Sequence, residues 1–222
     1  MAEAMTGSAR TRALGAEFTG TALLLLAVVG GGLAAAAGAP ALQPGLAAGL
    51  TLGVLITVLG PVSGAHFNPA VSLGAALLGA QRWADALAYM AAQVAGGIVG
   101  VVAADALFGR TVLQVSDTAR TGGALLGGEL VATLVLVMVI FGLARSGMGK
   151  VIGVGVGAWI SVAGLVLPSA FANPAVTVAR SLTDGAAGIA PGSLAGYVAA
   201  QLAAAGLAAA LVRWLFPSDA SA

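Results

Sequence analysis

Charged side chains are scarce in this sequence. Asp, Glu, Lys and Arg make up only 8% of its 222 residues, whereas a soluble domain carries roughly 25%. Hydrophobic residues make up 59% and the mean hydropathy is +1.04. The 9 basic and 8 acidic side chains cannot cover the surface of a 21.2 kDa globule. Most of that surface must therefore face lipid, and the composition predicts an integral membrane protein in a lipid bilayer.

Cysteine is absent and His66 is the single histidine. These absences exclude disulfides, thiolate nucleophiles, cysteine metal sites and clusters of several histidines. A formal net charge of +1 provides no basic field that could hold nucleic acid. No motif supplies a Ser or Thr with a basic partner, and no phosphate-binding loop is present. The sequence therefore predicts no enzyme activity, no cofactor, no metal and no nucleic-acid partner.

Six apolar runs can cross a bilayer, although the second and fifth are marginal in length. They cover about 13–37, 45–62, 84–108, 123–144, 151–168 and 193–216. The first run is longer than the roughly 7 to 15 residue core of a secretory signal, so we expect it to be a span. Two further segments, about 68–80 and 173–182, begin with Asn-Pro and are too short to cross. They predict re-entrant or interfacial helices.

The basic residues outside these runs are distributed unevenly. If the amino terminus is inside, one side receives Arg10, Arg12, Arg82, Arg145, Lys150 and Arg213, and the other receives Arg110 and Arg120. Because Lys and Arg accumulate in cytoplasmic loops, this pattern predicts that both termini are cytoplasmic. We expect a multi-pass protein of the inner (plasma) membrane.

The chain also repeats itself. Residues 68–72 (NPAVS) return as 173–177 (NPAVT), residues 89–93 (YMAAQ) return as 197–201 (YVAAQ), and Glu17 pairs with Glu129. These landmarks divide one channel domain, 1–222, into halves of about 10–105 and 122–216 with a connector of about 106–121. Three spans in each half is an odd number, so the second half must insert upside down. This inverted repeat is typical of channels and transporters.

Two Asn-Pro-Ala segments carry the chemistry of the sequence. They are Asn68, Pro69 and Ala70 in the first half, and Asn173, Pro174 and Ala175 in the second. Asn favours the N-cap and Pro the first helical position, so each marks a helix start. Pro61 and Pro168 lie upstream, and we expect them in the legs that re-enter the membrane. If the side-chain oxygen caps the helix, two amide N–H donors of each Asn remain for an aqueous path.

Opposed half-helices would bring two positive dipole ends together near the membrane midplane. Cations, and protons carried on a water chain, would be repelled there.

These residues together resemble one known family. Residues 63–71 (SGAHFNPAV), the second Asn-Pro-Ala, and 16–18 (AEF) with Glu129 resemble the aquaporin or major intrinsic protein family over nearly the whole chain. The resemblance implies an all-α membrane protein with six transmembrane helices plus two re-entrant half-helices around one pore per subunit. It also implies a homotetramer, and passive passage of water or small neutral solutes without a cofactor.

The sequence departs from the family at its selectivity filter. Members usually carry an arginine directly after the second Asn-Pro-Ala, where this chain has Val176. Counting without gaps places Ala48, Ser161 and Ala170 at the other filter positions, the first of which is aromatic in water-selective members. Replacing Arg by Val removes five donors and a charge. The resemblance therefore implies a wider, less polar constriction that admits glycerol-sized solutes.

Arg180 follows Val176 by one helical turn, about 5.4 Å. It is either a displaced cationic selectivity element or an interfacial arginine held by Asp184 or by loop carbonyls. The order Asn-Pro-Ala-Val-Thr-x-x-Arg is similar to that of bacterial members associated with metalloids. This similarity adds arsenite and antimonite hydroxides to the expected solutes.

Glu17 and Glu129 lie within apolar spans, where a carboxylate is costly and usually marks function. The family resemblance implies that each braces a re-entrant leg. His66 lies two residues before the first helix cap, where it either braces the first leg or acts as a pH gate near the cytoplasmic mouth. The expected function is a passive channel for water and small uncharged solutes that excludes protons and ions. Two alternatives remain: a proton-coupled secondary transporter with inverted repeats, and a structural member of the same fold without flux.

Overall fold

The computed structural model describes residues 5–38 and 44–217, and within them every regular element is helical. The elements are α1 (Gly7–Ala36), α2 (Pro44–Ser63), α3 (Pro69–Leu77), α4 (Trp83–Leu107), α5 (Gly123–Arg145), η1 (Gly149–Val151), α6 (Ile152–Val166), α7 (Pro174–Ala179), η2 (Arg180–Leu182), η3 (Gly185–Ala187) and α8 (Pro191–Leu215). The short helices α3 and α7 are the two segments that begin with Asn-Pro. The predicted all-α fold is confirmed.

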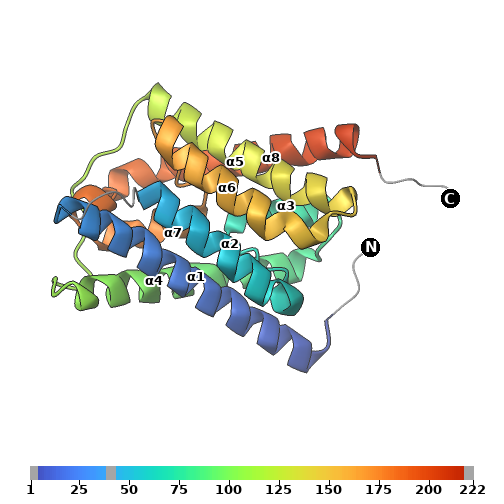
Figure 1. The fold of residues 1–222 in the computed structure, drawn as a ribbon, viewed down its shortest axis with the longest axis horizontal. Helices are drawn as coiled ribbons and strands as arrows, with labels where there is room; N and C mark the ends of the chain where they lie inside the picture. The colour runs from blue at the N-terminus through green and yellow to red at the C-terminus, as the bar shows by residue number, and fades with distance from the viewer. Residues whose placement is uncertain (1–4, 39–43, 218–222) are drawn as a thin grey trace.

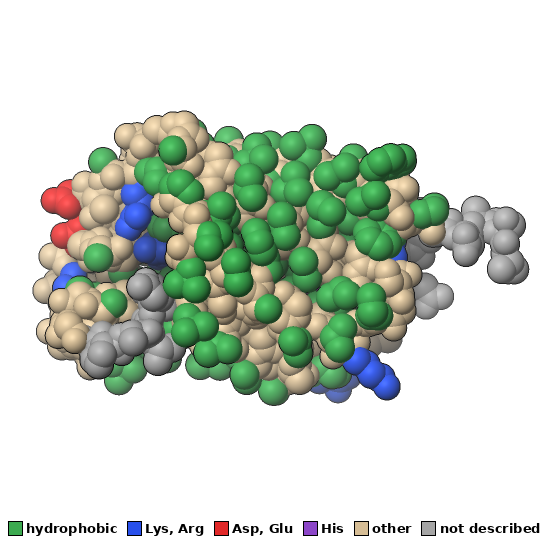
Figure 2. All heavy atoms as spheres, turned by 45° about the horizontal axis from the view of Figure 1, so that its top comes forward, with side chains coloured by type: hydrophobic (Ala, Val, Ile, Leu, Met, Phe, Trp, Pro, Cys, Tyr) green, Lys and Arg blue, Asp and Glu red, His purple; other side chains and the backbone are tan. Residues whose placement is uncertain are grey.

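Six of the described helical segments are long and apolar enough to cross a membrane. They are Gly7–Ala36, Gly45–Ser63, Trp83–Leu107, Gly123–Arg145, Gly149–Val166 and Gly185–Leu215. Large apolar side chains on their outer faces are exposed, for example Val54, which is 63% exposed, and Val154, which is 72% exposed. Figure 2 shows hydrophobic side chains over the middle of one face and charged side chains toward its ends. Such a surface suits lipid around the middle and water at both ends.

The half-helices α3 and α7 lie inside the ring of long helices (Figure 1). Around them α1 packs on α4 and α2, α2 packs on α6, and α5 packs on α8. Each half-helix contacts the other half of the chain, since α3 packs against α8 and α7 against α4. The first turn of α1 and the last turn of α8 lie at the same end of the molecule, and the connector lies at the opposite end (Figure 1).

Close helix contacts depend on glycine. A Cβ at Gly96 would lie 2.1 Å from the carbonyl oxygen of Phe18 on α1. A Cβ at Gly49 would lie 2.5 Å from the carbonyl oxygen of Gly157 on α6. Backbones can approach this closely only where no side chain intervenes. Gly123 and Gly127 on α5 have the same spacing, but a Cβ added at either one would meet no atom within 4 Å. This pair therefore has no packing role among the described residues.

Gly96→Ala is therefore expected to destabilise the folded protein by about 1–3 kcal/mol, because α1 and α4 must separate. The measurement is thermal unfolding of the purified protein in detergent. Gly206→Ala on α8 is the matched control, since its added Cβ meets nothing within 4 Å and helix propensity favours Ala by about 1 kcal/mol. Equal melting temperatures for the two variants would contradict this account of the α1–α4 contact.

The prediction that Pro61 lies in a re-entrant leg is wrong, because Pro61 lies inside α2. The helix continues to Ser63 and ends at Gly64, whose φ of +83° is the left-handed conformation that closes many helices. The stop signal is thus the glycine rather than the proline. The first leg is the segment 64–68 between α2 and α3, and the second leg is the segment 167–173 between α6 and α7. Pro168 lies in the second leg, as predicted.

Candidate pore and its two re-entrant legs

Asn68 and Asn173 are the N-caps of α3 and α7, in agreement with the predicted helix starts. The Oδ1 of Asn68 accepts a hydrogen bond from the N–H of Ala70 at 2.9 Å. The Oδ1 of Asn173 accepts from the N–H groups of Ala175 at 2.9 Å and Val176 at 3.3 Å. Each cap satisfies backbone donors that would otherwise be unpaired inside the protein.

The two asparagines also link the halves of the chain. The Nδ2 of Asn68 donates to the carbonyl of Ala172 at 2.7 Å, and the Nδ2 of Asn173 donates to the carbonyl of Phe67 at 2.8 Å. The expectation that each amide keeps two N–H donors for solute is therefore wrong. One donor of each holds the opposite leg, and one remains on each side chain.

The residue before each asparagine has an unusual backbone conformation. Phe67 has a φ of +49° and Ala172 a φ of +50°, a region that costs a non-glycine residue free energy. In both, the N–H bonds to a glutamate and the carbonyl bonds to an asparagine of the other half. These paired hydrogen bonds offset the strain and fix the direction of each leg.

Glu17, on α1, holds the first leg. Its Oε1 accepts from Ser63 Oγ at 2.6 Å and from the N–H of His66 at 3.0 Å. Its Oε2 accepts from the N–H of Phe67 and from Gln93 Nε2, both at 2.7 Å. The Glu17 side chain is fully buried, so these four donors replace its hydration.

Glu129, on α5, holds the second leg in the same way. Its Oε1 accepts from Ser169 Oγ at 2.6 Å and from the N–H of Phe171 at 2.7 Å. Its Oε2 accepts from the N–H of Ala172 at 2.8 Å and from Gln201 Nε2 at 2.6 Å. The two carboxylates thus have matching sets of donors: one serine, two backbone N–H groups and one glutamine.

Gln93 and Gln201 have a role that the sequence analysis missed. Each links its glutamate to a half-helix, because Gln93 Nε2 also bonds to Ser72 Oγ at 3.1 Å and Gln201 Nε2 to Thr177 Oγ1 at 2.9 Å. The signal was available, since the repeated pattern Tyr-x-x-x-Gln contains both glutamines. The pattern was used only to identify the repeat, and no role was predicted for its glutamines.

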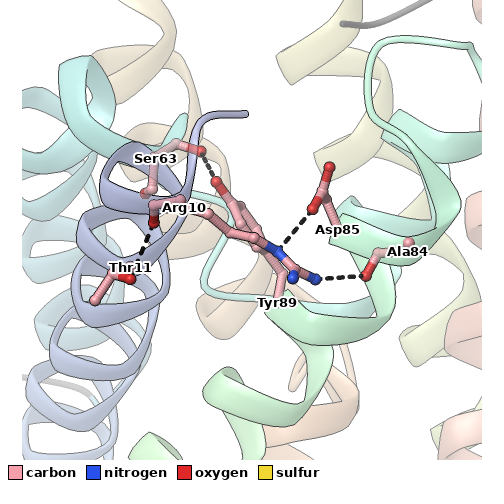
Figure 3. A network of polar contacts seen from close by, with 7 residues as sticks. Arg10, Thr11, Ser63, Ala84, Asp85 and Tyr89 are labelled. Carbon is pink, nitrogen blue, oxygen red and sulfur yellow. Dashed lines mark hydrogen bonds and ion pairs between the residues drawn. The ribbon is translucent and has the colours of Figure 1, made fainter. Parts of the chain in front are cut away.

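The start of the first leg, where α2 ends at Ser63, is tied to α4. Tyr89 donates to the carbonyl of Ser63 at 2.9 Å, and Arg10 Nε on α1 lies 3.0 Å from an Asp85 oxygen on α4. Figure 3 shows Arg10 reaching from α1 toward Asp85 beside this tyrosine. His66 contacts Ser72 Oγ through Nδ1 at 3.0 Å and packs edge to face against Tyr89. His66 therefore contacts residues of its own half rather than the cavity described next.

A cavity of about 350 Å³ runs from the two asparagines toward the connector end of the molecule. The predicted filter residues Ala48, Ala170 and Val176 line it, as do Asn68 and Asn173. Apolar side chains form much of the remaining wall: Leu24, Val28, Leu52, Leu136, Ile160 and Leu167. The lining thus combines amide groups with hydrocarbon, in a cavity of the size that small-molecule sites have.

Ser161, the fourth predicted filter residue, is not among the residues that line this cavity. Its hydroxyl donates to the carbonyl of Gly157 at 2.8 Å, and the residue lies against Gly49 where α2 meets α6. The α6 residues that line the cavity are Ile160 and Gly164. They are four residues apart and share one helix face, from which Ser161 is turned away by about 100°.

Arg180 also lines the cavity. Its Nε donates to the carbonyl of Ala187, so the prediction of a bond to loop carbonyls is correct and that of a pair with Asp184 is wrong. The Asp184 carboxylate instead accepts from Ser116 Oγ at 3.4 Å and the N–H of Asp117 at 3.2 Å. A second cation, Arg120 from the connector, lines the same cavity and was missed. No local sequence pattern marks it, because its position depends on how the connector folds over the mouth.

A membrane-embedded ring of helices with two half-helices that meet at capped asparagines beside a cavity defines a channel-type protein. The family described as Major intrinsic protein matches residues 4–167. Aquaglyceroporin AqpS of Rhizobium meliloti (strain 1021) is 46% identical over 211 residues, covering 92% of this chain and 90% of its own length. Aquaporin NIP1-3 of Oryza sativa subsp. japonica is 37% identical over 57% of this chain and 47% of its own length.

Among solved structures, the fold is similar to that of the aquaglyceroporin from Plasmodium falciparum. The TM-score is 0.73 at 21% identity, with 93% of this chain and 95% of the other covered. The chain belongs to the major intrinsic protein family. It is therefore a multi-pass membrane channel for small neutral solutes and not an enzyme, as the sequence predicts.

Proposed function

We propose that this channel conducts water and glycerol-like polyols through a constriction wide enough to admit both. The observation that carries the proposal is the wall between the asparagines and the outer mouth. There Ala48, Ala170 and Val176 line the cavity, so only small or aliphatic side chains stand at three of the four filter positions. At the fourth filter position, on α6, we assign Ile160 and Gly164 in place of Ser161, because they line the cavity and Ser161 does not.

The mixed polar and apolar lining of the cavity suits a polyol. A glycerol-like molecule presents hydroxyl groups along one edge and C–H groups along the other. The remaining N–H donors of Asn68 and Asn173 can bond the hydroxyls, while Leu24, Leu52 and Leu136 contact the carbons. Arsenite and antimonite as neutral trihydroxides carry hydroxyl groups of the same kind, and we include them among the proposed solutes.

Ion exclusion follows from the same geometry. The N-terminal ends of α3 and α7 meet where the asparagines of each half bond to the leg of the other, so two positive helix ends face the path. Cations are disfavoured there, and an orienting amide on each side interrupts proton transfer along a water chain. We also propose a homotetramer in the plasma membrane, with both termini cytoplasmic and the connector outside.

Light scattering of proteoliposomes tests this function. Vesicles exposed to a glycerol gradient are expected to shrink and then re-swell as glycerol enters, with arsenite entering the same vesicles. Vesicles exposed to sucrose are expected to shrink and stay shrunken. Empty vesicles provide the background rate. A protein that passes water but leaves glycerol outside would contradict the proposed wide constriction, and a protein without any flux would favour a structural role.

A further inference from the structure

Three consecutive carbonyls at the outer mouth hold two arginines side by side. Arg120 donates through Nη2 to Ala186 at 2.7 Å and through Nε to Gly188 at 2.8 Å. Arg180 donates through Nε to the carbonyl between them, that of Ala187. The connector and the end of the second half-helix thus each contribute one guanidinium to the same short loop.

Both guanidiniums also face the same aromatic ring. The central carbon of Arg180 lies 3.8 Å from the ring centroid of Phe171, and that of Arg120 lies 5.3 Å from it. The two central carbons are therefore at most about 9 Å apart, the sum of these distances. Two like charges so close repel one another in a partly desolvated site, and the fixed carbonyls and the ring keep them together.

No carboxylate neutralises this pair within residues 5–38 and 44–217. The ion pairs found there are Arg10 with Asp85 and Arg110 with Asp105. Asp184 is directed to the connector, where a hydrogen bond from the N–H of Gly185 keeps the pKa of its carboxyl below the usual value.

Glu129 is the remaining acidic group near the site. Its two oxygens already accept four hydrogen bonds from the second leg and Gln201. It contributes a negative field but has no free lone pair for either arginine.

Several guanidinium donors remain available at the cavity. Nη1 of Arg120 and both Nη atoms of Arg180 have no hydrogen-bond partner among the described residues, and both side chains line the cavity. Figure 2 shows Lys and Arg side chains recessed at one end of the molecule, with Asp and Glu side chains farther out at its edge. A planar guanidinium edge matches two oxygens of one anion.

We propose that this outer vestibule is a binding site for a small oxyanion, such as sulfate, phosphate or a short carboxylate, held between Arg120 and Arg180. Because both arginines line the cavity through which solutes pass, the bound anion narrows the path and slows neutral flux. The binding itself requires only the two arginines. The slowing of flux rests on the proposed channel function.

Binding is measured first, on the purified full-length protein in detergent with radiolabelled sulfate as the probe and chloride as the background salt. We expect saturable binding, weakened about tenfold or more by Arg120→Gln and by Arg180→Gln, since each removes a charge-assisted hydrogen-bonding group. Arg82→Gln is the control, because Arg82 is exposed and precedes α4 outside the cavity. Arg120→Lys keeps the charge without the planar fork and is expected to lose less than Arg120→Gln.

Thermal unfolding of each variant shows whether it is folded, and Arg120→Lys carries the test if the glutamine variant is not. Competition by phosphate and by formate then distinguishes a tetrahedral from a planar ligand. Saturable binding that both glutamine variants leave unchanged would overturn the proposal. Absence of saturable sulfate binding would do the same.

Flux is measured second, in vesicles of zwitterionic lipid with sulfate at equal concentration on both sides. Glycerol entry is expected to slow as sulfate rises, relative to chloride at the same ionic strength, and the Arg120→Gln channel is expected to lose this inhibition. Equal effects of sulfate and chloride would contradict obstruction by a bound anion. Absence of glycerol flux without any sulfate would instead contradict the proposed function and leave the binding result standing.

Discussion

Glu129→Ala is expected to prevent formation of a stable channel. The substitution leaves three N–H donors without an acceptor, two from the backbone of the second leg and one from the Gln201 amide, and it leaves the Ser169 hydroxyl with only Tyr197 as a partner. Each orphaned buried group costs about 1–3 kcal/mol, against a total stability of about 5–15 kcal/mol for a typical protein. The measurement is the yield and the thermal unfolding of the detergent-purified protein. Asp117→Ala, in the exposed connector, is the control.

Glu129→Gln separates this structural role from proton coupling. Glutamine keeps the shape but presents an amide N–H₂ to two of the four donors, so we expect a large loss of stability. Any surviving protein should conduct glycerol with the same pH dependence as the wild type. A stable Glu129→Gln protein whose flux no longer responds to pH would indicate a transporter instead.

The double substitution Val176→Arg with Ala48→Phe is expected to reduce glycerol flux about tenfold or more while reducing water flux much less. Both positions line the cavity and both side chains are small or aliphatic. A phenyl ring and a guanidinium there occupy space that a polyol needs, whereas single-file water needs less. A third guanidinium would also stand close to Arg120 and Arg180.

The measurement is the ratio of glycerol to water permeability in the same vesicles. Val54→Phe on the outer face of α2 is a control for the added aromatic ring, because Val54 is 63% exposed and does not line this cavity. Equal loss of both permeabilities in the double variant would show that these two positions do not form the constriction.

The helical spans and the capped half-helices could be predicted because each is encoded locally. Asn favours the N-cap and Pro favours the first helical position, so the order Asn-Pro predicts a helix start at Asn68 and at Asn173. A buried carboxylate needs donors, and the legs are the nearest unpaired backbone to Glu17 and Glu129. The spans and the helix starts required only composition, spacing and hydrogen-bonding capacity, whereas the bracing role of the two glutamates was implied by the family resemblance.

The features that were missed depend on how distant segments meet. The bonds from each asparagine to the opposite leg exist only when both halves are in place. Ser161 was selected by counting without gaps, but Ile160 and Gly164 line the cavity from α6. A shift of one residue turns a helical position by about 100°. Arg120 reaches the cavity through the connector, whose path no local propensity determines.

The most direct test of passive conduction is glycerol flux into proteoliposomes as a function of the glycerol gradient, measured with and without an imposed pH gradient while an internal dye reports proton movement. The account predicts that glycerol flux rises in proportion to the glycerol gradient and is the same with and without the pH gradient. It also predicts that glycerol entry does not acidify the vesicle interior. Flux that saturates, follows the pH gradient and carries protons with it would contradict the account and identify a proton-coupled transporter.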